Sequence, residues 1–86
     1  MNSIIVTVTD KKNRFMFDMD VPTDLPGMKL AEDVMEVLNE RDPELYLNAR
    51  YHCFYLNRQG RILSDRETLA EAGVWNGDYM TITSRM

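Results

Sequence analysis

Cysteine and histidine are almost missing from this sequence of 86 residues, which has one of each, Cys53 and His52. A lone cysteine allows no internal disulfide, so a disulfide-stabilised secreted domain is excluded. The two residues also provide too few ligands for a zinc site of CxxC type or for an iron–sulfur cluster. Because they are adjacent on an expected strand, their side chains point to opposite faces and cannot form a catalytic pair.

Long hydrophobic runs and an excess of basic residues are also lacking. The apolar run within residues 1–12 (MNSIIVTVTDKK) is too short for a signal peptide or a membrane span. The net charge of −4 gives no basic footprint for binding nucleic acid. We therefore expect a cytoplasmic protein that neither inserts into a membrane nor binds nucleic acid.

The residues that are present suffice for one hydrophobic core. Hydrophobic residues make up 44% of the chain and charged residues 28%, a balance that is ordinary for a folded, soluble protein. A chain of this length is expected to form a single domain over residues 1–86, without the deep cleft that lies between two domains in many enzymes.

Periodicity along the chain predicts the elements of this domain. β-branched runs and alternation of apolar with polar residues predict strands at residues 3–9, 14–21, 51–57, 61–63 and 79–83. The helical spacing of Leu30, Val34, Val37 and Leu38 predicts one long helix over residues 28–40, with Thr23 or Asp24 as its cap. Residues 64–73 are expected to hold a short helical turn.

This order of elements predicts the fold class. Two strands, a helix, two further strands, a helical turn and a last strand form an α+β domain, in which a mixed sheet of four to five strands is packed by one helix. The segment from Leu63 to Val74 (LSDRETLAEAGV) resembles ubiquitin. The segment from Gly73 to Tyr79 (GVWNGDY) is similar to that of the YukD/EsaB family, small bacterial ubiquitin-like proteins associated with type VII (WXG100) secretion.

The resemblance implies a ubiquitin-like β-grasp fold and a role as a protein-interaction module, acting as an accessory or adaptor of type VII secretion. The same fold occurs as a cytoplasmic domain on a membrane component of that system. A ubiquitin-like domain of a larger protein, acting as a scaffold, is therefore the alternative. A covalent modifier or sulfur carrier needs a Gly-Gly end, whereas this sequence reads Thr83-Ser84-Arg85-Met86.

The candidate interaction residues lie on the expected third and last strands. If Phe54 and Leu56 point into the core, then Cys53 and Tyr55 point outward, and Tyr79 joins them on the last strand. Tyrosine is frequent among the residues that dominate protein interfaces. Scattered exposed aromatic side chains are also common and carry no meaning by themselves. We predict that Cys53, Tyr55 and Tyr79 form a contact face for a protein partner.

Catalytic, cofactor and metal sites are not expected. Asp18 and Asp20 alternate on the outward face of the second strand, but a hard cation requires more converging oxygen ligands than two carboxylates supply. The sequence has neither a glycine-rich phosphate loop nor a nucleophile placed beside a base. We therefore predict a protein that is not an enzyme.

Overall fold

The computed structural model describes residues 2–85, so Met1 and Met86, at the two ends of the predicted 1–86 domain, lie outside the described residues. The elements in chain order are β1 (Ser3–Asp10), β2 (Met16–Pro22), α1 (Gly27–Arg41), the 3₁₀ helix η1 (Pro43–Leu45), β3 (His52–Leu56), β4 (Arg61–Ile62), α2 (Leu69–Ala72) and β5 (Tyr79–Ser84). All of the predicted strands and the long helix are present, with bounds that differ by at most two residues, and the predicted helical turn is α2, which lies within residues 64–73.

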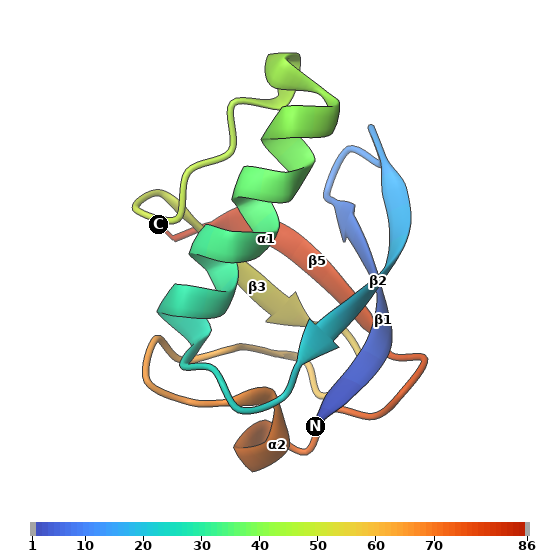
Figure 1. Cartoon of the computed structure of the whole chain (residues 1–86), viewed down its shortest axis with the longest axis vertical. Coiled ribbons are helices and arrows are strands. Elements are labelled where there is room, and N and C mark those ends of the chain that lie inside the picture. Colours follow the sequence, from blue (N-terminus) through green and yellow to red (C-terminus); the bar gives the residue numbers. More distant parts are fainter. Residues whose placement is uncertain (1, 86) are drawn as a thin grey trace.

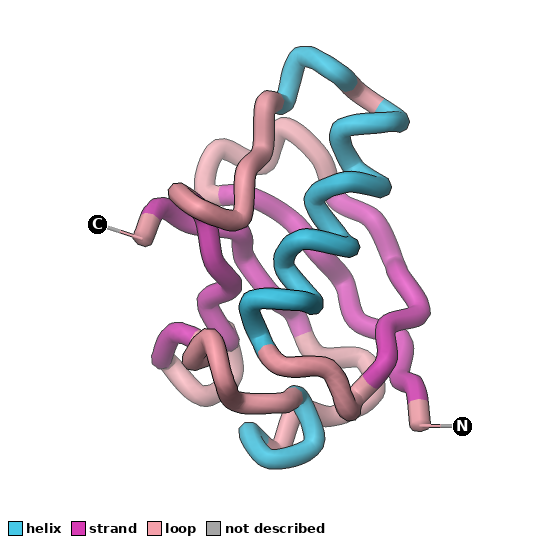
Figure 2. Tube along the Cα trace, turned by 60° about the vertical axis from the view of Figure 1, so that its left-hand side comes forward, coloured by secondary structure: helices cyan, strands magenta, loops and turns pink. Residues whose placement is uncertain are grey.

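The strands form one mixed sheet in the order β2-β1-β5-β3-β4, and α1 crosses one face of it (Figure 1). β1 and β5 run parallel at the centre, with Thr7 paired to Tyr79, and the other neighbouring strands run antiparallel. Figure 2 shows the helix lying over the strands as a separate layer. The predicted α+β fold with one helix on a mixed sheet is confirmed. Within residues 2–85, none of the helices combines the length and the apolar character needed to cross a bilayer.

The core lies between α1 and the inner face of the sheet. The side chains of α1 that it buries are Leu30, Ala31, Val34, Met35 and Leu38. The prediction that Val37 belongs to this stripe is wrong, because Val37 is 44% exposed and Met35 is buried instead. At 100° per residue the buried face is centred near Val34 and Leu38 and extends toward Met35, which leaves Val37 at the rim beside β2.

The first turn of α1 is held by a loop rather than by a side-chain cap. The backbone N–H of Gly27 donates to the carbonyl of Glu67 over 2.8 Å, and that of Met28 donates to the carbonyl of Asp65 over 3.0 Å. These carbonyls satisfy N–H groups that have no partner inside a helix. The expected cap at Thr23 or Asp24 is therefore wrong, since no side chain caps this helix and Pro26 occupies the position before it.

Candidate protein-interaction surface

The face of the sheet opposite α1 is open. Val6 and Val8 of β1 are fully buried beneath the helix, so alternation along the strand directs Ile5 and Thr7 to the other side. The strand register continues this side across the sheet. We call it the outer face and define it by Ile5, Thr7, Tyr55, Ile62, Tyr79 and Thr81.

Tyr55 and Tyr79 both lie on the outer face, as predicted. Tyr55 is paired with Thr81, two residues beyond Tyr79 on β5, so the two tyrosines are diagonal neighbours. Tyr55 is 37% exposed and Tyr79 is 49% exposed. The hydroxyl of Thr81 donates to Asn57 Oδ1 over 2.8 Å and ties β5 to the end of β3. Strands rather than loops therefore hold the backbone of both tyrosines.

Cys53 does not belong to the accessible part of this face, and the prediction that it is exposed is wrong. Its exposed fraction is 4%, and its partner across the strands, Thr83, is also buried. Chain segments flank β3 on both sides here, since the N–H of Leu63 donates to the carbonyl of Phe54. Alternation along a strand predicts the side of the sheet to which a residue points, but not how far its side chain is buried. The short Cys53 side chain is covered by the segments that flank β3. Burial raises the pKa of the Cys53 thiol, although the charge of Arg85 acts to lower it.

A third aromatic side chain, Trp75, was missed by the sequence analysis. It is 63% exposed and lies in the loop between α2 and β5. The guanidinium carbon of Arg58 lies 3.7 Å from the centroid of its ring. Arg58 also donates through Nε to both carboxylate oxygens of Asp78, each over 3.1 Å, and through Nη2 to the carbonyl of Gly73 over 2.6 Å. The loop that carries Trp75 is thus fixed from one side by a single arginine.

The same loop is fixed to β1 from its other side. The N–H of Ile5 donates to Asn76 Oδ1, and the N–H of Gly77 donates to the carbonyl of Ile5, both over 2.7 Å. Gly77 adopts a φ of 91°, a conformation that favours glycine. Because the loop is bonded to Ile5 and leads directly into Tyr79, it places Trp75 at the end of the sheet where β5 begins. The sequence contains one signal for this arrangement: Arg58 and Asp78 have opposite charges and lie on two predicted turns, which indicates that the turns could be joined by an ion pair.

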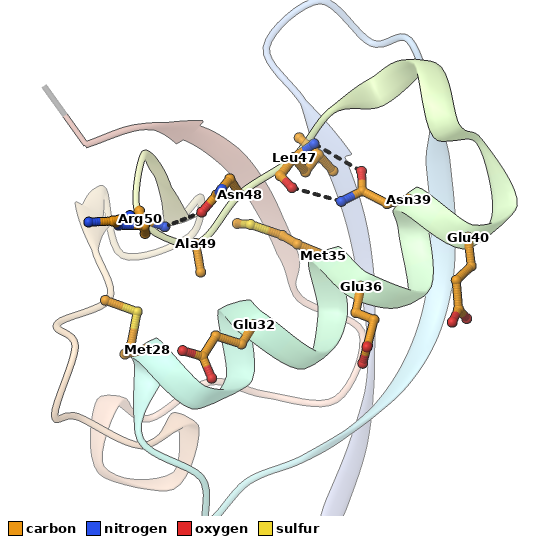
Figure 3. Close-up of a pocket in the computed structure, with 10 residues that line it drawn as sticks. All are labelled: Met28, Glu32, Met35, Glu36, Asn39, Glu40, Leu47, Asn48, Ala49 and Arg50. Atoms are coloured by element: carbon orange, nitrogen blue, oxygen red, sulfur yellow. Dashed lines mark hydrogen bonds between the residues drawn. The ribbon is translucent and has the colours of Figure 1, made fainter.

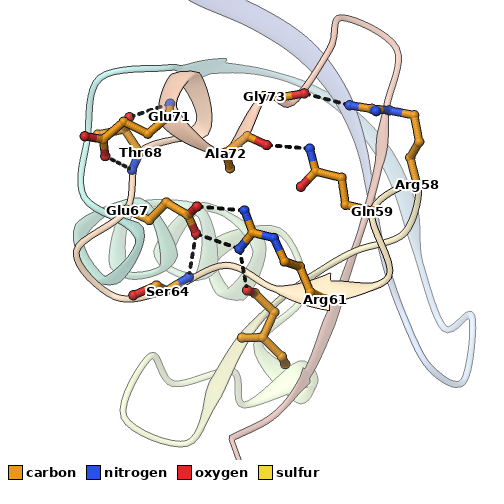
Figure 4. A network of polar contacts seen from close by, with 10 residues as sticks. Arg58, Gln59, Arg61, Ser64, Glu67, Thr68, Glu71, Ala72 and Gly73 are labelled. Atoms are coloured by element: carbon orange, nitrogen blue, oxygen red, sulfur yellow. Dashed lines mark hydrogen bonds and ion pairs between the residues drawn. The ribbon is translucent and has the colours of Figure 1, made fainter.

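The two arginines of the β3–β4 hairpin are neutralised by carboxylates. Arg61 forms a two-bonded ion pair with Glu67, over 2.9 and 2.7 Å, and Glu67 also accepts the N–H of Ser64 (Figure 4). The hydrogen bond from Arg58 holds the pKa of Asp78 below its ordinary value and outweighs burial, which acts to raise it. The bond from Arg61 lowers the pKa of Glu67 in the same way. The Arg58–Asp78 and Arg61–Glu67 ion pairs order the segments before and after α2, and each pair neutralises its own charge.

The other residues considered from the sequence do not converge. Asp18 accepts a hydrogen bond from the hydroxyl of Thr7 over 2.7 Å, and His52 Nδ1 lies 3.0 Å from the carbonyl oxygen of Asn48. Within residues 2–85, no three histidine, cysteine, aspartate or glutamate side chains are placed to share a metal ion.

A hollow also lies beside α1, on the opposite side of the molecule from the outer face. Segment 47–50 runs along the helix, and the amide of Asn39 bonds both the N–H and the carbonyl of Leu47 (Figure 3). Glu32, Glu36 and Glu40 project along one side of this hollow. They are exposed, so their charges are largely solvated.

A family model described as "WXG100 protein secretion system (Wss), protein YukD" matches residues 3–82. The ubiquitin-like domain of the Mycobacterium tuberculosis type VII secretion system protein ECCD1 is 22% identical with a TM-score of 0.74, and the match covers 98% of this chain and 100% of that chain. The ubiquitin of Caldiarchaeum subterraneum is 17% identical with a TM-score of 0.75, over 99% of this chain and 96% of that chain.

A third similar structure is part of a larger chain. It belongs to the MycP5-free ESX-5 inner membrane complex and is 20% identical to this chain, with a TM-score of 0.76. The match covers 98% of this chain but only 21% of that chain. At such identities these likenesses show the fold alone. The search of curated protein sequences gave no match.

Proposed function

The chain belongs to the YukD family of the WXG100 protein secretion system, and from that premise we propose that it is a non-catalytic interaction module that binds a component of this system through its outer face. The binding is non-covalent and takes place in the cytoplasm. Tyr55 and Tyr79 on this face, and Trp75 at the end of the sheet where β5 begins, carry it, because all three are exposed aromatic side chains.

The observation that supports this proposal is the exposure of three aromatic side chains that ordered backbone carries. Tyrosine, tryptophan and arginine are the residues that most often dominate binding energy at protein interfaces. A ring that is already ordered loses little conformational entropy when a partner binds. Arg58 orders the ring of Trp75, and paired strands hold the backbone of the two tyrosines.

Capture experiments with single variants test the proposal. Tagged Tyr79→Ala and Trp75→Ala proteins should capture less of their partner from cells that express the secretion system, while their thermal melting stays close to that of the wild type. Tyr46→Ala is the matched control, since Tyr46 is 81% exposed but lies outside the outer face, after η1. Equal capture by wild type and the outer-face variants would contradict the proposal.

Non-covalent binding is tested separately. Intact-mass analysis of cell extract should show the protein at its own mass, without a series of heavier conjugates. Such a series would identify a covalent modifier and would overturn this part of the proposal.

The likeness to a domain within a larger membrane-complex chain favours a second candidate function, that of a scaffold domain whose partner is part of the same complex. Immunoblotting of cell extract against this sequence separates the two candidates. A band near 10.1 kDa supports a free adaptor, whereas a much larger band supports a domain of a longer protein.

A further inference from the structure

β2 lies at one edge of the sheet and has a single neighbouring strand, β1. On β1, the N–H groups of Ile5 and Thr7 are bonded on the side of β5, to Asn76 Oδ1 and to the carbonyl of Asp78. Ile5 and Thr7 are opposite Asp20 and Asp18. In an antiparallel pair of strands, two residues that are opposite each other direct their backbone groups either both toward each other or both outward. Because Ile5 and Thr7 direct theirs toward β5, the residues opposite them on β2 direct theirs away from β1. The N–H and C=O groups of Asp18 and Asp20 therefore face the free edge.

An apolar hollow runs beside this edge, between β2 and α1. It is lined by Phe17, Met19, Val37, Leu38 and Arg41, and β2 also contributes Asp18 and Asp20 to the lining. Val37 is 44% exposed, and Phe17 and Met19 are half-buried. The guanidinium of Arg41 lies 4.6 Å from the centroid of the Phe17 ring and bounds the hollow there.

The other side of β2 carries negative charge. Asp18 and Asp20 point to the side away from α1, and both are exposed. Among residues 2–85, no lysine, arginine or histidine forms an ion pair with either carboxylate. Asp18 accepts only the neutral hydroxyl of Thr7 among the hydrogen bonds found.

We propose that β2 binds an extended segment of a protein partner as an additional strand, and that this segment alternates basic and apolar residues. The free backbone groups of β2 would pair with the segment. Since side chains alternate along a strand, its apolar residues would enter the hollow beside Val37, and its basic residues would lie next to Asp18 and Asp20. Charge complementarity selects such a partner.

The same charges argue against a second copy of this chain as the occupant. If the β2 strands of two copies paired, the Asp18 and Asp20 carboxylates of one copy would lie next to those of the other on the same side of the joined sheet. Like charges opposite one another across strands are destabilising. The occupant is therefore a different segment. Asp18 and Asp20 lie on the same side of the sheet as Tyr79, but β1 separates β2 from β5, so the site does not include Tyr55, Tyr79 or Trp75.

A synthetic peptide of alternating lysine and valine residues, with blocked ends, is the probe. Nuclear magnetic resonance titration of the labelled protein should shift the amide signals of Met16, Asp18 and Asp20 first. A peptide of the same length with N-methylated backbone on its pairing edge should bind at least about tenfold more weakly, because it lacks the donors that form the ladder. Equal binding of both peptides, or shifts centred away from β2, would overturn the proposal.

Charge reversal provides the matched comparison. Asp18→Lys/Asp20→Lys should weaken binding of the lysine–valine peptide by about tenfold and should favour a glutamate–valine peptide instead. Glu32→Lys/Glu36→Lys is the control, because it makes the same change in net charge on the other side of α1. Equal weakening in both proteins would reduce the effect to net charge and would overturn the proposal.

A last pair of variants separates this site from the tyrosines of the outer face. Tyr79→Ala should leave peptide binding unchanged, whatever it does to partner capture. Val37→Glu, which alters an exposed helix position in the hollow, should weaken peptide binding while melting remains near that of the wild type. Unchanged binding by Val37→Glu would contradict the placement of the apolar residues.

Discussion

The guanidinium of Arg58 lies over the ring of Trp75, 3.7 Å from its centroid, and bonds the carboxylate of Asp78 three residues further along the chain. One side chain of the β3–β4 turn thus orders the loop that precedes β5. The N–H of Trp75 also donates to Asp78 Oδ2 over 2.9 Å, so Trp75 and Arg58 share one carboxylate.

Removal of Arg58 should loosen this loop. We expect Arg58→Ala to lower the free energy of unfolding by about 1 kcal/mol, since the ion pair is partly exposed and its contribution is screened by solvent. Trp75 is the only tryptophan, so its fluorescence anisotropy should fall in the variant while the fold is retained. Urea unfolding measures the stability. Arg66→Ala is the control, because Arg66 is exposed and forms no ion pair with any residue between 2 and 85. An equal loss in both variants would contradict this role.

The lowered pKa of Asp78 makes part of the stability depend on pH. The hydrogen bond from Arg58 favours the ionised carboxylate in the folded state, so its contribution is fully present above the ordinary pKa of 3.8. It is lost as the pH falls through the lower, folded-state pKa. Urea unfolding of wild type and Asp78→Asn at a series of pH values should show a difference that shrinks in acid. A constant difference would show that Asp78 acts through its shape rather than its charge.

Gly27 should resist replacement by alanine, although alanine has the higher helix propensity. A Cβ at this position would lie 2.2 Å from the carbonyl oxygen of Ser64, a backbone atom that cannot rotate away. We expect Gly27→Ala to destabilise the protein by about 1–3 kcal/mol, the usual range for an overpacked position. Urea unfolding measures the change. Increased stability in this variant would mean that the loop at Ser64 yields.

Cys53 should react slowly with thiol reagents. It is 4% exposed, and burial raises its pKa, so little thiolate is available in the folded state. Its modification by a disulfide reagent should accelerate by at least about a hundredfold when urea unfolds the chain. Rapid modification of the folded protein would place this thiol at the surface, as the sequence analysis expected.

Local periodicity predicted the fold well because each element has a clear pattern. The alternation of Phe15, Phe17, Met19 and Val21 identified β2, and Leu69 and Gly73 marked the helical turn that became α2, where Leu69 is fully buried and Gly73 adopts a φ of 73°. The helix cap was predicted wrongly because its partners, the carbonyls of Asp65 and Glu67, come from a loop far along the chain.

The candidate surface was predicted only in part. Alternation placed Tyr55 and Tyr79 on one face, and their register in the sheet brought them near each other. Trp75 was missed because a residue in a loop has no periodicity that indicates its direction. Cys53 was correctly placed on a strand, but its burial was not predicted, since it depends on how neighbouring segments of the chain pack over the side chain.

The parallel pairing of β1 with β5 also constrains synthesis of the protein. Thr7 and Tyr79 meet at the centre of the sheet, so the ribosome must release nearly all of this sequence before the central hydrogen bonds can form. Contacts between distant parts of a chain slow folding. Until Tyr79–Ser84 emerges, β1 lacks its central neighbour and β3 cannot join the sheet, so strand edges and apolar surface stay exposed in a form that is prone to aggregate.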